Sequence, residues 1–309
     1  MSWSDCPDAR VQSDAPRTPG VDLVIVPRTS DVGGLDVARA LPSRQRRMVG
    51  PFVFLDQMGR GRFEAGSGLD VRPHPHIGLS TLTWLFEGAL MHRDSLGSVQ
   101  RIEPGAVNWM TAGRGVVHSE RTPDDLREGA SVLAGMQAWL ALPESLETCE
   151  PEFRHYSTAA IPRAEDGGWV ASVVIGEAFG VRSPVATPTD TVYVDLDLAA
   201  GARVAIEPVA EERALYLYAG ALRVDGRLEP SGRLLVLAPG ARIELEAEQG
   251  ARVILLGGEP MDGPRYLWWN FVSSSTDRIR AAQADWAQGR FPPVPGDPER
   301  IPLPDLPGP

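Results

Sequence analysis

The chain has 309 residues, enough for about two domains that each bury a core of their own. A hydrophobic content of 43% and a charged content of 23% exclude wholesale disorder and collagen-like repeats. All 30 basic residues are arginine, against 41 acidic residues, which gives a net charge of −11. Without lysine, Schiff-base and P-loop lysine chemistry is excluded, and the acidic balance disfavours direct binding to nucleic acid.

The cysteine content and the N-terminal sequence indicate a cellular compartment. Cys6 and Cys149 lie far apart and form no Cys-x-x-Cys motif, so neither a disulfide scaffold nor a thiolate metal cage is encoded. The opening MSWSDCPDAR lacks the cationic and apolar regions of a signal peptide, and no apolar run approaches the roughly 18 residues that span a bilayer. We therefore expect a cytoplasmic protein with no membrane partner.

Short apolar runs broken by turn residues dominate the chain. Residues 1–20 are polar and are expected to form an N-terminal tail. From Val21 onward come VDLVIVP, PFVFLDQ, STLTWLFEG, VVHSE and MQAWLALP, whose β-branched and aromatic content predicts strands. A less regular stretch near 143–168 precedes a second series that includes VYVDLDL, ALYLYAG and ARVILLGG. The two series predict an all-β protein with two barrel-like or sandwich-like halves.

One segment, TDRIRAAQADWAQG, predicts a helix. Ile279, Ala282 and Trp286 share one face, Ser275 or Thr276 serves as N-cap, and Gly289 ends the helix. The proline-rich sequence that follows is expected to be extended.

The histidines confine any metal site to the first half of the chain. All five lie within the first 155 residues, and residues 156–309 contain neither histidine nor cysteine. His74 and His76 form one i, i+2 pair, and His118 and Glu120 form another. Side chains two apart on a strand share a face, so two facing strands would bring three imidazoles and one carboxylate together.

Such a mixed nitrogen and oxygen set leaves coordination positions open. It suits Fe(II), Mn(II), Ni(II) or Cu(II) better than a closed, cysteine-rich structural zinc site. An open site indicates catalysis or ligand sensing. From the spacing alone, surface pairs or hydrogen-bonded core residues are an equal alternative.

The sequence around these pairs resembles the pirin family of bicupin proteins. The motifs that carry the resemblance are HPHIG, FEGALMHRDSLG and NWMTAGRGVVHSER, within residues 73–121. DVGGLDVARALP, VGPFVFLDQMG, YLWWNFVSSS and GRFPPVPGDPERIPLP extend it over roughly residues 21–305.

This resemblance implies two β-barrel cupin domains packed face to face, with a short C-terminal helix. The domains would be a metal-binding cupin at 21–150 and a degenerate, metal-free cupin at 151–270, followed by a helix and proline-rich tail at 271–309. The implied metal ligands are His74, His76, His118 and Glu120, the residues that the spacing also indicates. The expected metal is Fe(II), with Mn, Ni, Cu or Zn as alternatives.

Further residues are candidates for the surroundings of the site. His92 is expected to contact Asp94 in a turn, with lining of the site as the alternative. Asp56, Gln57 and Gln137 could point toward the mouth of the site, or form hydrogen-bonded edges of the core.

Two positions depart from the pattern of the family. Ser80 stands where many pirins carry an acidic residue, and Gln57 stands where many bacterial relatives have histidine. Both departures could change the charge of the site or its substrate preference.

Two functions are compatible with this reading. The first is a mononuclear iron dioxygenase of the quercetin 2,3-dioxygenase type, acting on a flavonol-like aromatic substrate and O2, with Glu120 as the catalytic residue that takes the substrate's hydroxyl proton. The second is a non-enzymatic, redox-dependent regulator that binds a transcription factor or a metabolic enzyme. The net charge of −11 would make any contact of such a regulator with DNA indirect.

Overall fold

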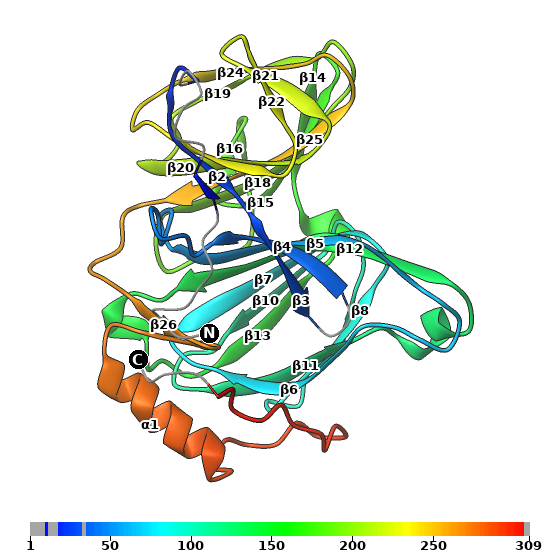
Figure 1. Cartoon of the computed structure of the whole chain (residues 1–309), viewed down its shortest axis with the longest axis vertical. Helices are drawn as coiled ribbons and strands as arrows, with labels where there is room; N and C mark the ends of the chain where they lie inside the picture. The colour runs from blue at the N-terminus through cyan, green and yellow to red at the C-terminus, as the bar shows by residue number, and fades with distance from the viewer. Residues whose placement is uncertain (1–9, 12–17, 33–34, 306–309) are drawn as a thin grey trace.

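A computed structural model of the chain describes residues 10–11, 18–32 and 35–305. Its strands form two units that lie one above the other along the longest axis of the molecule (Figure 1). The predicted tail at 1–20 falls mostly outside the described residues, although β1 (Arg10–Val11) pairs with β2 (Val21–Val26). The all-β prediction with two units is confirmed.

The first unit consists of a larger and a smaller antiparallel sheet. In spatial order the seven strands of the larger sheet are β13 (Glu152–Tyr156), β10 (Val107–Thr111), β7 (Leu79–Glu87), β12 (Ser131–Ala141), β5 (Phe52–Phe63), β4 (Leu35–Leu41) and β3 (Arg28–Val32). The four strands of the smaller sheet are β6 (Asp70–His76), β11 (Val116–Arg121), β8 (Leu90–Asp94) and β9 (Val99–Ile102). The two sheets face each other without closing into one hydrogen-bonded ring.

Strand β7 lies between the two units, and all of its residues from Leu79 to Leu85 are buried. Leu82 and Trp84 face the second unit, where they join a core that includes Tyr193. The alternating side chain of Thr83 faces the interior of the first unit and contacts Glu120. Both faces of this strand are therefore buried.

The second unit repeats this arrangement with a different interior. Its eight-stranded sheet has the order β1, β2, β23 (Arg233–Leu237), β20 (Glu212–Ala219), β25 (Ala251–Gly258), β18 (Thr191–Leu198), β15 (Trp169–Ile175) and β14 (Arg163–Asp166). Its four-stranded sheet has the order β19 (Arg203–Ile206), β24 (Ile243–Ala247), β21 (Ala221–Val224) and β22 (Arg227–Pro230). A short hairpin of β16 (Glu177–Ala178) and β17 (Val181–Arg182) completes the unit. Apolar side chains such as Val194, Leu215 and Leu245 fill the space between the two sheets.

The two units are interlaced along the chain. The sequence predicts that β2 belongs to the first domain, but this strand pairs with β23 of the second unit. Strand β13, from the segment assigned to the second domain, pairs with β10 of the first unit. The division in space thus differs from a single cut near residue 150.

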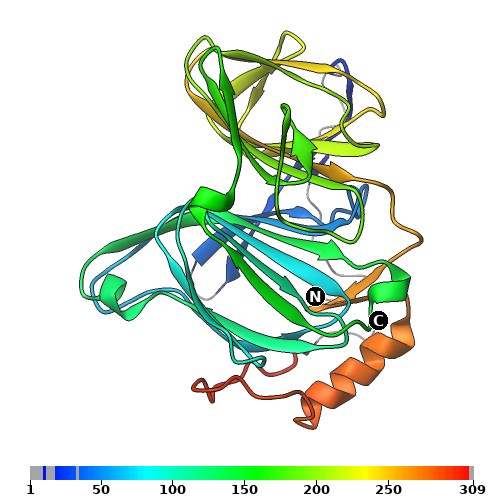
Figure 2. The same cartoon turned by 180° about the vertical axis from the view of Figure 1, so that it is seen from behind.

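The chain returns to the first unit at its C-terminal end, as Figure 2 shows from behind. The hairpin of β26 (Tyr266–Trp268) and β27 (Phe271–Ser273) leads into α1 (Thr276–Ala287). Ile279, Ala282 and Trp286 of α1 are buried, and these residues belong to a core cluster with Ile77 and Val117.

The predicted helix and its buried face are confirmed. Three short 3-10 turns lie at Asp124–Arg127, Glu144–Leu146 and Thr158–Ala160. The last two fall within the stretch predicted to be irregular, but that prediction is wrong for β13 and β14, which form strands in the same stretch. Among the described residues, no helix has the length and apolar character needed to cross a membrane.

Candidate metal centre

Three histidines converge inside the first unit. His74 and His76 come from β6 and His118 from β11. The spacing led us to expect that these strands face each other, but they are hydrogen-bonded neighbours in one sheet, where His118 lies opposite His74. One ring nitrogen of each lies within 4.8 Å of the others, and the side chains are buried, with residue exposures of 6%, 1% and 1%. Among the described residues these histidines form a group that can hold a metal ion.

Hydrogen bonds set the tautomers of two of these rings. Nδ1 of His74 lies 2.9 Å from the carbonyl oxygen of Arg72, and Nδ1 of His76 lies 3.1 Å from that of Asn270. A carbonyl oxygen only accepts, so both Nδ1 atoms donate. Each ring therefore keeps the lone pair on Nε2 for a metal.

His118 is oriented by a chain of two further residues. Nε2 of His92 donates to Oδ2 of Asp94 at 2.9 Å, so in the tautomer whose single proton lies on Nε2, Nδ1 of His92 is an acceptor. Nδ1 of His118 lies 3.4 Å from that atom, and with this tautomer of His92 it is the donor. Nε2 of His118 is then a buried lone pair, and it has no hydrogen-bond partner in the structure. An orphaned buried nitrogen beside two others is the arrangement that a bound metal ion would satisfy.

Burial keeps the three imidazoles neutral. Desolvation lowers the pKa of His74 from 6.5 to about 4 and lowers those of His76 and His118 well below 6.5. The proximity of the rings adds to the effect for His76 and His118, because each would repel a proton on its neighbour. Neutral imidazoles are the form that binds a metal.

Glu120 lines the same cavity, but the group of mutually close ligand atoms comprises only the histidines. Its Oε1 accepts from the Thr83 hydroxyl at 3.3 Å, and that hydroxyl also lies 2.9 Å from Oε1 of Gln137. The register of β6 against β11 shifts between His118 and Glu120. Such an irregularity changes the direction in which the following side chains point. It explains why the Glu120 carboxylate lies apart from the imidazoles, although the spacing predicts it beside them. Desolvation raises the pKa of this carboxyl.

A cavity of about 350 Å³ opens over the histidines. One wall is a series of stacked groups: the Arg39 guanidinium lies 4.4 Å from the centre of the Phe54 ring, which stacks on Trp139 at 4.0 Å. Trp139 in turn contacts His76 edge to face, with ring centres 5.0 Å apart. The cavity thus joins an aromatic surface to the three imidazoles, and its volume suits a small-molecule ligand.

Of the residues expected around the site, some point into the cavity and others point away from it, according to the face of the strand on which they lie. Asp56 and Gln137 line the cavity, and Asp56 forms a bidentate pair with Arg39 at 2.7 and 2.8 Å. Desolvation raises the pKa of Asp56, against the opposing effect of Arg39. His92 contacts Asp94 as expected, although the contact supports His118 rather than only a turn.

Gln57 does not reach the mouth of the cavity. Because it follows Asp56 on β5, it points to the opposite face, where its Oε1 accepts from the Tyr216 hydroxyl at 2.6 Å. Ser80 is buried and hydrogen-bonded to Thr111, and it is not among the residues that line the cavity. Neither departure from the family pattern therefore touches the cavity wall directly.

Sequence reasoning missed several residues at this site. Thr83 had a detectable signal, because threonine alternates with large apolar residues in STLTWLF. Trp139 and Arg39 belong to strands for which the sequence does not show which of the two alternating sets of side chains faces the cavity. Asn270 acts through its backbone carbonyl, for which no side-chain signal exists.

Two all-β units and a histidine cluster inside the first of them define the class: a two-domain cupin with a candidate metal centre. Residues 34–140 match the family model Pirin, and residues 193–292 match the Pirin C-terminal cupin domain. The chain belongs to the pirin family.

Known relatives span nearly the whole chain. A pirin-like protein of Caulobacter vibrioides is 49% identical over 289 residues, covering 92% of this chain and all of the relative. The crystal structure of quercetin 2,3-dioxygenase from Acinetobacter baumannii is 40% identical with a TM-score of 0.85, covering 92% of this chain and 95% of that one. A bacterial pirin from Escherichia coli in complex with nickel(II) is 19% identical with a TM-score of 0.58, covering 76% and 96%, a likeness of fold alone.

Proposed function

We propose that this pirin is a mononuclear Fe(II) dioxygenase that cleaves a flavonol-like aromatic substrate with O2. The observation that carries the proposal is the buried, orphaned Nε2 of His118, beside the two imidazoles of β6 at the floor of an aromatic-walled cavity. The 40% identity to quercetin 2,3-dioxygenase from Acinetobacter baumannii supports the choice of substrate class. The cytoplasmic location expected from the sequence is part of this proposal.

The donor set fits an open metal site. His74, His76 and His118 would supply three neutral nitrogen ligands, and Glu120 would supply a fourth ligand by turning its carboxylate away from Thr83. Bound iron would supply Lewis-acid activation of the substrate and redox chemistry with O2. Three or four protein ligands leave coordination positions open.

The protein residues would bind the substrate and move its proton. A planar aromatic ring system would lie along Phe54 and Trp139, where apolar surface excludes water. When Glu120 is not a metal ligand it keeps its hydrogen bond from Thr83 at Oε1, and Oε2 is then the atom that would accept the hydroxyl proton of the substrate. Because burial raises the pKa of Glu120, the proton would be held near the reacting centre rather than released to solvent.

The test is turnover by protein loaded anaerobically with Fe(II) and mixed with quercetin and O2. We expect bleaching of the flavonol with matching O2 consumption and release of carbon monoxide, and strongly reduced rates in H118A and E120A. Quercetin loss no faster than in E120A, with iron content measured and equal, would refute the enzymatic proposal and favour the regulatory alternative.

A further inference from the structure

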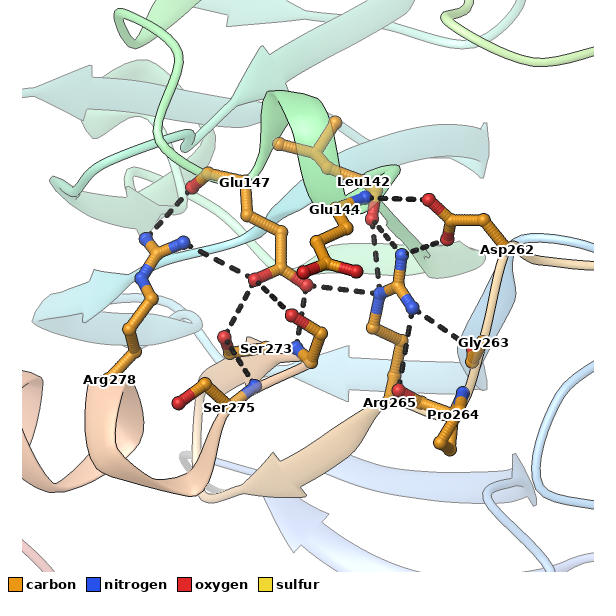
Figure 3. Close-up of polar contacts among 11 residues, drawn as sticks. Leu142, Glu144, Glu147, Asp262, Gly263, Pro264, Arg265, Ser273, Ser275 and Arg278 are labelled. Carbon is orange, nitrogen blue, oxygen red and sulfur yellow. Dashed lines mark hydrogen bonds and ion pairs between the residues drawn. The ribbon is translucent and has the colours of Figure 1, made fainter.

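A buried cluster of charged side chains lies outside the histidine site (Figure 3). At its centre is the carboxylate of Glu147, which is 1% exposed and follows the 3-10 turn after β12. Arg265 contacts it at 3.1 Å and Arg278 at 3.2 Å. The side chain of Arg265 is itself only 1% exposed, so two opposite charges are held together away from water.

The same carboxylate accepts hydrogen bonds from the end of the C-terminal hairpin. The hydroxyl of Ser273 donates to Oε2 at 2.7 Å, and the backbone N–H of Ser274 donates to Oε1 at 2.6 Å. Arg278, on the first turn of α1, also donates to the backbone carbonyl of Glu147 at 3.0 Å. One side chain of the first unit therefore fixes both ends of the segment from Arg265 to Arg278.

The tip of this hairpin reaches the histidine site. Its turn places the carbonyl oxygen of Asn270 3.1 Å from Nδ1 of His76, the contact that sets the tautomer of that ring. The neighbouring Trp269 lines the cavity and holds a positive φ of 52°, a conformation that a bulky residue adopts only when its surroundings impose it.

The backbone that follows His76 is tied to the same segment. Ile77 forms a bridge with Phe271, and the N–H of Val272 donates to the carbonyl of Ile77 at 3.2 Å. Arg265 donates to the carbonyl of Leu142, whose own N–H donates to the carbonyl of Gly78 at 3.0 Å. The ring of His76 and the backbone that follows it, at Ile77 and Gly78, are thus held by residues that converge on Glu147.

We infer that Glu147 is a positioning residue for the metal centre: through the 265–278 segment it fixes the Asn270 carbonyl against His76 and so orients this ligand. The inference rests on the proposed function only in taking His76 as a metal ligand. Groups that orient ligating histidines typically change metal affinity by 10- to 100-fold when they are removed. A purely structural role, docking α1, would instead affect stability alone.

The test uses Co2+ alone as the probe on the full chain, with its d–d absorption spectrum and its affinity measured by competition with a chelator. For E147Q we expect an affinity at least 10-fold weaker and an altered spectrum in the folded protein. The matched control is E150Q, three residues along the same loop, because the side chain of Glu150 is 80% exposed and pairs with Arg114 at the surface. E150Q should bind Co2+ as the wild type does.

A milder variant covers the case in which E147Q does not fold. S273A removes a single hydrogen bond to Glu147 and should weaken Co2+ binding several-fold. If E147Q folds, a Co2+ affinity within twofold of the wild type and an unchanged spectrum would overturn the inference. If E147Q does not fold, the same result in S273A would overturn it. Failure of the wild type to bind Co2+ at all would instead refute the metal site of the proposed function.

Discussion

At the scale of single residues, the candidate centre depends on the placement of protons as much as on the ligands. Asp94 accepts from His92, and His92 accepts from His118, so the lone pair at Nε2 of His118 is set by a carboxylate two rings away. The i, i+2 spacing predicted the clustering of the histidines. The direction of each ring depends on partners that lie elsewhere in the chain.

Replacing Asp94 with asparagine should reverse this order of donors. The amide oxygen can still accept from the N–H groups of Leu96 and Ser98, which now donate to Oδ1 at 2.9 Å each. Its NH2 group would donate to Nε2 of His92, moving the proton of His92 to Nδ1 and that of His118 to Nε2. We expect D94N to fold and to bind Co2+ at least 10-fold more weakly. Wild-type affinity in D94N, with D125N as the exposed control, would contradict the relay.

Protonation of the buried histidines should destabilise the metal-free protein in mild acid. The pKa of His74 falls from 6.5 to about 4 on folding, so between these pH values the unfolded chain binds a proton that the folded chain does not. The contribution of His74 to the free energy of unfolding is therefore fully present above pH 6.5. It is lost as the pH falls toward 4, and the loss is about 3 kcal/mol for His74 alone. His76 and His118 act in the same direction.

Urea unfolding of metal-free protein at pH 7.5, 6 and 5 measures this loss. An H74Q variant, which lacks the titrating ring, should lose less stability over the same range. Equal pH dependence in H74Q and the wild type would show that His74 does not contribute.

At the scale of elements, the sequence predicts the type of each segment better than its partner. The helix at 276–287 was predicted because Ile279, Ala282 and Trp286 repeat at helical spacing. Strand β5 was also predicted, but Asp56 and Gln57 are both polar neighbours on a strand buried on its two faces. Nothing local indicates which of them faces the cavity, and only the packing of the second unit against Gln57 decides it.

The turn between β6 and β7 is a point where only glycine fits. Gly78 has a φ of 67°, and a Cβ there would lie 2.0 Å from the carbonyl oxygen of Val272. Gly66 has a φ of 84° but nothing within 4 Å of such a Cβ. We expect G66A to cost about 1 kcal/mol of unfolding free energy through backbone strain, and G78A about 2 to 4 kcal/mol because a steric clash is added. Denaturant titrations of both variants compare them, and equal losses would exclude the clash.

At the scale of the whole molecule, charge is distributed unevenly. The chain carries a net charge of −11, yet four arginines line the cavity beside the two carboxylates Asp56 and Glu120. These arginines are Arg28, Arg39, Arg44 and Arg47. Composition alone gave no indication of this cluster of arginines, because the residues come together only when β3, β4 and the following loop fold over the site.

If the proposed function holds, this cavity should favour anionic substrates at low ionic strength. We expect the ratio of kcat/KM for a sulfonated quercetin to that for neutral quercetin to fall several-fold between low and high salt, because mobile ions screen the arginines over about 10 Å. The neutral flavonol in the same buffers is the control. A ratio independent of salt would show that the arginines do not attract the substrate.

The interlacing of the two units has a consequence for any attempt to divide the protein. Strand β2 must find β23, which is synthesised about two hundred residues later, while the hairpin and α1 return to cover Ile77 and Val117 beside the histidines. A fragment ending near residue 150 would keep β2 without its partner and would lose the Asn270 carbonyl that orients His76. The complementary fragment would expose β23 as an unpaired edge prone to aggregation. The ligand-bearing half is therefore complete only as part of the intact chain.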